Sequence, residues 1–160
     1  PKVPCTRDYV LVYMLSYDEV VVNLANKVSE LLNCEIILLD SGLSKGIAGM
    51  KQRKDCGPEE FLRYVADASY VITNSFHGTV FSVIFNKQFY TVPHKTKGSR
   101  MINFCRKLGL ENRIVYDSKK ISNTEIEKHV DYEIVQPKLE ELKKVGVDFI
   151  KHALEEAGRE

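Results

Sequence analysis

Continuous apolar runs alternate along this chain with segments whose apolar residues recur every three or four positions. The apolar runs are rich in β-branched and aromatic residues, which is typical of strands covered on both faces. They predict strands at residues 9–15, 34–40, 70–73, 89–93 and 113–116. The helical pattern predicts helices at 18–32, from 58, at 78–86, at 99–108, after 122 and from 137. The Gly- and Lys-rich stretch at 41–57 is interpreted mainly as a loop.

Local capping signals support several of these helix boundaries. Pro58 is expected at the first position of a helix and is followed by two acidic residues, and Gly109 marks a helix end. Ser122 and Glu125 have the spacing of a capping box. Pro137 is expected to begin the last helix, whose wide apolar stripe we expect to meet a partner. That stripe consists of Leu139, Leu142, Val145, Phe149, Ile150 and Ala153.

The alternation of strands and helices predicts an α/β fold, a Rossmann-like three-layer domain with a parallel sheet flanked by helices. Residues 1–160 are expected to form one such domain, because this length suits a single core. In parallel sheets, ligands bind outside the carboxyl ends of the strands. The loops after residues 70–73 and 89–93 should open onto this edge, so we expect the site there.

The composition excludes several classes of function. With 23 Lys and Arg against 22 Asp and Glu, the net charge is +1, which gives no electrostatic footprint for nucleic acid. No apolar run is long enough for a transmembrane segment. The four cysteines lack C-x-x-C spacing and are interpreted as reduced thiols. The residue pattern calls for no metal and no organic cofactor.

The first candidate site follows the strand at 70–73, where Asn74, Ser75, His77 and Thr79 surround Gly78. The free backbone N–H groups of a helix start attract anions, and a glycine allows close approach to the backbone. A histidine there can bind an anion or transfer a proton near neutral pH. The same pattern also fits a simple helix cap with a packed histidine.

A second group of candidates follows the strand at 89–93. Gly98 and Ser99 mark another helix start, and Lys97 and Arg100 flank it. A cation in the first helical turn is disfavoured by the helix dipole, so Arg100 suggests a negatively charged ligand. Lys95 is interpreted as a solvated surface charge.

The stretches "TNSFHGTVFSVIFNKQFYTVP" (73–93) and "KGSRMINFCRKLGLENRIV" (97–115) resemble the polysaccharide pyruvyl transferase family. The resemblance implies the C-terminal half of a GT-B-like, two-domain transferase, with an N-terminal domain as partner. It implies transfer of pyruvate from phosphoenolpyruvate to hydroxyls of a glycan or lipid-linked sugar, as a ketal. His77 matches the histidine that this family uses in donor binding and catalysis. A cytoplasmic location is implied, at the inner membrane face through the acceptor.

The sequence departs from the family pattern at Ser75, because several members have an arginine two residues before the histidine. Another cation, such as Arg100, would then bind the donor, or the donor differs. One alternative is a GT-B glycosyltransferase that uses a nucleotide sugar, although residues 79–85 lack the acid that would bind a ribose. Another is a non-catalytic assembly module. We expect the chain alone to bind donor weakly without turning over substrate.

Overall fold

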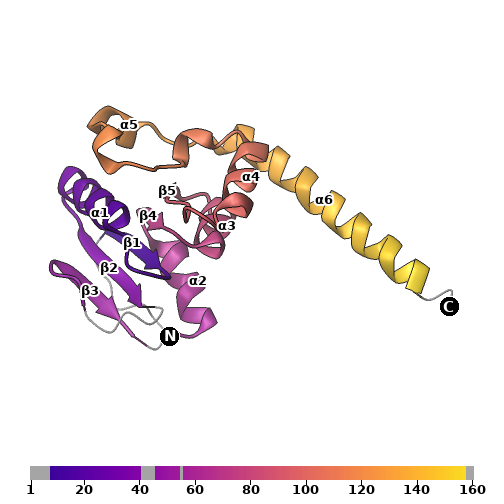
Figure 1. Cartoon of the computed structure of the whole chain (residues 1–160), viewed down its shortest axis with the longest axis horizontal. Helices are drawn as coiled ribbons and strands as arrows, with labels where there is room; N and C mark the ends of the chain where they lie inside the picture. The colour runs from indigo at the N-terminus through magenta and orange to yellow at the C-terminus, as the bar shows by residue number, and fades with distance from the viewer. Residues whose placement is uncertain (1–7, 41–45, 55, 158–160) are drawn as a thin grey trace.

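The computed structural model describes residues 8–40, 46–54 and 56–157 (Figure 1). Five strands form one sheet in which all pairings are parallel, in the order β3-β2-β1-β4-β5. The strands are β1 (Tyr9–Met14), β2 (Glu35–Asp40), β3 (Met50–Arg53), β4 (Tyr70–Thr73) and β5 (Gln88–Thr91). The α-helices are α1 (Glu19–Leu32), α2 (Pro58–Asp67), α3 (Phe76–Ile84), α4 (Ser99–Leu108), α5 (Asn123–Glu127) and α6 (Tyr132–Ala157). The predicted α/β fold class is confirmed.

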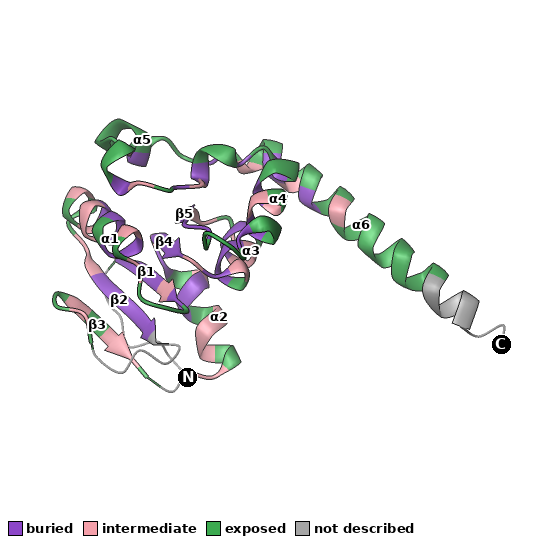
Figure 2. Ribbon diagram, viewed as in Figure 1, coloured by how far each residue is buried: buried purple, intermediate pink, exposed green. Residues whose placement is uncertain are grey.

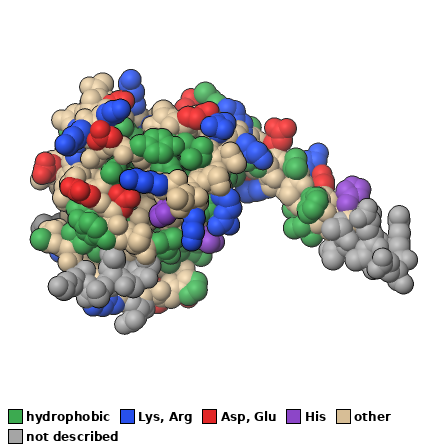
Figure 3. Space-filling model, in the orientation of Figure 1, with side chains coloured by type: hydrophobic (Ala, Val, Ile, Leu, Met, Phe, Trp, Pro, Cys, Tyr) green, Lys and Arg blue, Asp and Glu red, His purple; other side chains and the backbone are tan. Residues whose placement is uncertain are grey.

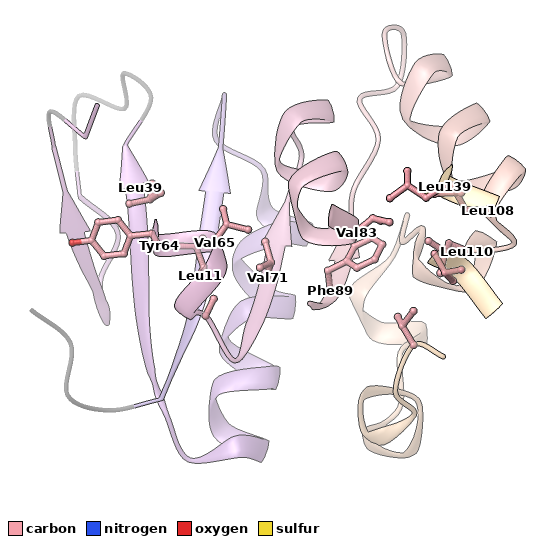
Figure 4. Packing of buried hydrophobic residues seen from close by; sticks show 14 of the residues in the cluster. Leu11, Leu39, Tyr64, Val65, Val71, Val83, Phe89, Leu108, Leu110 and Leu139 are labelled. Atoms are coloured by element: carbon pink, nitrogen blue, oxygen red, sulfur yellow. The ribbon is translucent and has the colours of Figure 1, made fainter. Parts of the chain in front are cut away.

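Alternate residues of β1, β2, β4 and β5 contribute to two separate cores, one on each face of the sheet. Leu11, Val71 and Phe89 pack with helices α2, α3, α4 and α6 (Figure 4). Val12 and Ile72 pack on the other face with α1 and α5. Because successive strand residues point to opposite faces, a continuous apolar run is what a doubly covered strand requires.

The stretch predicted as a loop at 41–57 contains the edge strand β3, so that prediction is wrong in part. The strand reads MKQR and, among the described strands, pairs with β2 alone. Polar residues are common on edge strands because one side of the strand faces solvent. This composition is why the apolar pattern did not reveal the strand.

Residues 113–116 do not form the predicted fifth strand. Arg113 ends a 3-10 helix, η1 (Glu111–Arg113), and the following Ile114 makes only an isolated parallel bridge to Thr91. Arg113 itself is 2% exposed and its guanidinium donates to the hydroxyl of Tyr70 at 3.3 Å and to the carbonyl of Lys128. The segment is therefore joined to the sheet mainly by the buried side chain of Arg113 rather than by the backbone hydrogen bonds of a strand.

The last helix begins at Tyr132, five residues before Pro137, which lies inside it. The Asp131 carboxylate accepts a hydrogen bond from the Glu133 N–H at 3.1 Å, so Asp131 starts the helix in place of the proline. Pro137 has no N–H, so the helix lacks the backbone hydrogen bond that this position would donate to the carbonyl of Glu133. The predicted helix is confirmed, and its predicted start is wrong.

The outer part of α6 leaves the body of the molecule and is exposed (Figure 2). Of the predicted apolar stripe, Leu139 is buried and Leu142 half-buried, whereas Val145, Phe149 and Ile150 are 63%, 74% and 58% exposed. The side chain of Ala153 lies outside the described part. The expected partner of the stripe stays a prediction.

Candidate functional site

The centre of the sheet contains a point where the strand order reverses. The loop after β1 leads to α1 on one face, and the loop after the neighbouring β4 leads to α3 on the other. The carboxyl ends of such a strand pair form the usual ligand crevice of an open α/β sheet. The candidates at 74–79 lie there, as the sequence predicted from the strand ends.

Asn74 connects the two loops at this crevice. Its side-chain oxygen accepts from the Leu15 N–H at 2.9 Å, and its amide nitrogen donates to the Ser16 carbonyl at 3.0 Å. The side chain therefore holds the β1–α1 loop in place. The carboxamide also lies on the wall of a hollow described below.

Ser75 and Thr79 are both 0% exposed. The Ser75 hydroxyl caps α3 by accepting from the Gly78 N–H at 3.4 Å. The Thr79 hydroxyl bonds the Ser75 carbonyl at 3.0 Å and the Thr91 hydroxyl at 2.8 Å. Their side chains are thus engaged inside the protein, and the cap expected as the alternative interpretation of Ser75 is present.

Gly78 faces the protein interior. A Cβ atom at this position would lie 2.4 Å from the Thr73 hydroxyl oxygen. That hydroxyl donates to the Tyr13 carbonyl at 2.6 Å and accepts from the Ser75 N–H at 3.0 Å. The glycine lets α3 approach the end of β4, which is a packing role, and the predicted approach of a ligand to Gly78 stays a prediction.

His77 is exposed at the second position of α3. It lines a hollow of about 410 Å³ whose wall is mainly apolar, which we call the histidine hollow. The other lining residues are Tyr13, Leu39, Cys56, Gly57, Pro58, Phe61 and Phe81. Among the described residues, the imidazole makes no hydrogen bond and its ring contact is with Phe76, at 6.1 Å between centroids. His77 is therefore available to a ligand.

A second hollow of about 370 Å³ lies on the other side of Phe76, and we call it the cationic hollow. Its lining residues are Leu15, Ser16, Asp18, Asn74, Phe76, His94, Lys97, Gly98, Arg100 and Met101. Within the described ranges, Lys97 and Arg100 form no ion pair, although the Asp18 carboxylate caps α1 at the rim. Figure 3 shows Lys, Arg and His side chains gathered on this face near the start of α6.

Phe76 lines the cationic hollow and contacts His77, which lines the histidine hollow. The Arg100 guanidinium lies over its ring, 5.2 Å from the centroid, while the His77 ring meets it edge to face. The sequence predicted a single cluster of candidate residues. The structure brings Asn74, Lys97 and Arg100 together in the cationic hollow, whereas His77 lines the neighbouring histidine hollow. Ser99 is exposed at the start of α4 but does not line the cationic hollow.

Sequence reasoning missed the aromatic wall of the histidine hollow. Phe61 and Phe81 were assigned to helices, but their meeting with Tyr13 depends on how α2 and α3 pack. One local signal was present: His77 and Phe81 are four residues apart, so they share a helix face. In the described ranges no group of His, Cys, Asp and Glu is arranged to hold a metal ion, and no helix is long and apolar enough to span a bilayer.

The sequence model of the polysaccharide pyruvyl transferase family matches residues 4–96. The chain belongs to this family. The matched range includes β1 to β5 and the candidate residues 74–79 at the start of α3, whereas Lys97 and Arg100 lie beyond it. No curated protein sequence matches the chain.

Solved structures support the fold. The glycosyltransferase SnogD from Streptomyces nogalater is similar with a TM-score of 0.55 at 13% identity, over 87% of this chain and 40% of that protein. The UDP-GlcNAc 2-epimerase of Methanocaldococcus jannaschii, solved with UDP-GlcNAc and UDP, has a TM-score of 0.47 at 16% identity, over 83% of this chain and 38% of that one. The chain thus spans about 40% of the length of SnogD. The likeness to SnogD confirms the GT-B-like, Rossmann-type α/β fold.

Proposed function

We propose that this chain is the donor-side half of a transferase that moves pyruvate from phosphoenolpyruvate to sugar hydroxyls of a surface polysaccharide. The observation that carries the proposal is an accessible histidine near two cations that form no ion pair with any described residue, at the strand reversal of a family member. An N-terminal domain would complete the cleft.

The cationic hollow suits the donor. Phosphoenolpyruvate carries a phosphate and a carboxylate on three carbons, so its binding requires compensation of negative charge. Arg100 and Lys97 supply cations, and α4 starts at Gly98 without a side-chain cap, which leaves N–H groups of its first turn for an anion. A guanidinium can bind either anionic group through two parallel hydrogen bonds.

Ser75 stands where several family members have an arginine, and because it is buried its side chain cannot bind the donor in place of that arginine. Donor binding therefore needs another cation. A buried capping residue contacts no ligand through its side chain. Arg100 comes from the next helix and covers the ring of Phe76, the residue after Ser75. In this proposal Arg100 takes over the role of that arginine from a different element.

The chemistry needs proton transfer rather than a metal. A proton is added to the enol methylene carbon of the donor while a sugar oxygen bonds to the neighbouring carbon. The bond from that carbon to the phosphate oxygen then breaks, and a second sugar hydroxyl completes the ketal. The two hydroxyl protons end on the new methyl group and on the phosphate. In this proposal His77 carries such a proton, which its exposed imidazole allows.

Binding of phosphoenolpyruvate and of inorganic phosphate to the purified chain, measured by calorimetry, tests the donor site. Arg100→Gln should weaken binding about 10- to 100-fold, the effect of losing a hydrogen bond to a charged group. Arg106→Gln is the control, because Arg106 is exposed in the last turn of the same helix. Equal binding by wild type and Arg100→Gln, or preferential binding of UDP, would refute the donor assignment.

In the full-length gene product, His77→Ala should lower pyruvyl transfer by about 10²–10⁴-fold, the usual contribution of a general acid or base. Thermal stability should not change, because the side chain is exposed. Near-normal transfer by this variant would remove His77 from the mechanism. Loss of stability instead of rate would assign it a structural role.

A further inference from the structure

The histidine hollow combines an aromatic wall with a polar rim. The Phe61 ring lies at its middle, 4.8 Å from the ring of Tyr13 and 5.7 Å from the ring of Phe81, between centroids. The three rings are inclined to one another and each is only half-buried. Apolar surface left open beside polar groups commonly marks a binding site.

We infer that the histidine hollow binds the pyranose ring of the sugar acceptor. A pyranose has a face of C–H bonds with slight positive charge, and the face of an aromatic ring is negative, so the two attract. Its hydroxyls project from the edge of the ring and need hydrogen-bond partners. The hollow offers both kinds of contact, and its volume of about 410 Å³ lies within the range of roughly 300–1,000 Å³ typical of ligand sites.

The polar groups of the rim lie where hydroxyls would project. The Tyr13 hydroxyl and the His77 imidazole make no hydrogen bond with the residues that the structure describes. A purely apolar ligand would leave these groups without partners, whereas a sugar satisfies them.

The position of the hollow relative to the cations also favours an acceptor. The inference rests on the proposed function, because a sugar acceptor is expected only if the chain takes part in transfer to a sugar. Lys97 and Arg100 lie on one side of Phe76, and the aromatic wall lies on the other. His77 stands at the boundary, so a donor and a sugar bound in the two hollows would meet beside it.

The experiment is a titration of the isotope-labelled chain with methyl β-D-galactopyranoside, followed by NMR shifts of backbone amides. A parallel titration with inorganic phosphate reports on the cationic hollow. We expect the saccharide to shift amides of α2 and α3 around Phe61 and Phe81, and phosphate to shift those around Arg100. Cyclohexanol, an apolar ring with one hydroxyl, should bind more weakly than the saccharide.

Phe61→Leu removes the middle ring and should weaken saccharide binding about three- to tenfold, with phosphate binding unchanged. Phe85→Leu is the matched control: its ring stacks on Phe81 but lies outside the hollow, so saccharide binding should not change. If Phe61→Leu does not fold, His77→Ala tests the rim instead. It should weaken binding about three- to tenfold through the lost hydrogen bond.

The inference would be overturned if the saccharide caused no amide shifts at its solubility limit, or if cyclohexanol bound more tightly than the saccharide. Saccharide shifts that map to Tyr17 and Tyr116, which line a different hollow, would also overturn it. Normal saccharide binding by both Phe61→Leu and His77→Ala would do the same. Saccharide binding without phosphate binding supports the acceptor hollow and counts against the donor proposal alone. Phosphate binding without saccharide binding counts against the acceptor hollow alone.

Discussion

Replacing Gly78 by alanine adds a single methyl group at the contact between α3 and β4. The new Cβ would lie 2.4 Å from the Thr73 hydroxyl oxygen and 3.0 Å from the Thr73 Cβ. Thr73 is 0% exposed, and its hydroxyl is bonded to the Tyr13 carbonyl and the Ser75 N–H, so it has no free direction in which to move. Either the helix shifts outward or the threonine loses hydrogen bonds.

Two opposing terms set the size of the effect. Alanine is favoured over glycine in a helix interior by about 1 kcal/mol, and by less in the first turn where Gly78 stands. Overpacking of a tight contact costs about 1–3 kcal/mol, and each lost hydrogen bond about 0.5–1.5 kcal/mol. The steric terms win, so we expect Gly78→Ala to lower the free energy of unfolding by about 1–3 kcal/mol. For a chain of this size the melting temperature should fall by about 2–12 °C.

Thermal and urea unfolding followed by circular dichroism measure this loss. Gly146→Ala is the matched control, since a Cβ there meets nothing within 4 Å and should only raise helicity. In a Thr73→Ala background most of the cost of Gly78→Ala should disappear, because the hydroxyl oxygen at 2.4 Å is gone and only the Cβ contact at 3.0 Å remains. Wild-type stability of Gly78→Ala, or an unchanged cost in that background, would refute the packing argument. Unchanged stability with lost phosphate binding would instead give Gly78 the ligand role that the sequence suggested.

Two further predictions concern Arg113, at the end of η1, and the capping box of α5. Arg113→Met should lower the free energy of unfolding in urea by about 2 kcal/mol, because buried acceptors at Tyr70 and Lys128 lose their donor; an unchanged midpoint would contradict this. The pKa of Glu125 is lowered by hydrogen bonds from the backbone and hydroxyl of Ser122, so its stabilisation is present above the ordinary pKa of 4.5 and is lost as the pH falls through the lowered value. Glu125→Gln should therefore flatten the acid side of the melting-temperature profile in that window, and an unaltered profile would show that the capping box contributes nothing.

Local signals were sufficient for much of the fold. The helix predicted at 99–108 is α4 with the same ends, and Gly109 adopts the left-handed conformation, φ +72°, that a helix end favours. The capping box of Ser122 and Glu125 is present. Such features depend on residues within one turn of each other, so the sequence alone specifies them.

The position of the site was also encoded locally, since an apolar run followed by Asn74 and a helix start identifies the carboxyl end of a strand. The shape of the site was not encoded locally. The rotation of α3 against β4 and α4 decides which side chains of its first turn are buried and which face solvent. That rotation buries Ser75 and Thr79 and leaves His77 outside.

The sequence therefore determined the layers, most element boundaries and the edge of the sheet that carries the site. Only the tertiary structure decided that Phe76 would stand between His77 and Arg100, that Gly78 would pack on a threonine, and that three aromatic rings would leave an open hollow. The physical reason is the range of the interactions. Hydrogen bonds and dihedral preferences within a turn act between neighbours in sequence, whereas the walls of a hollow come from elements whose relative rotation is set by packing of the whole core.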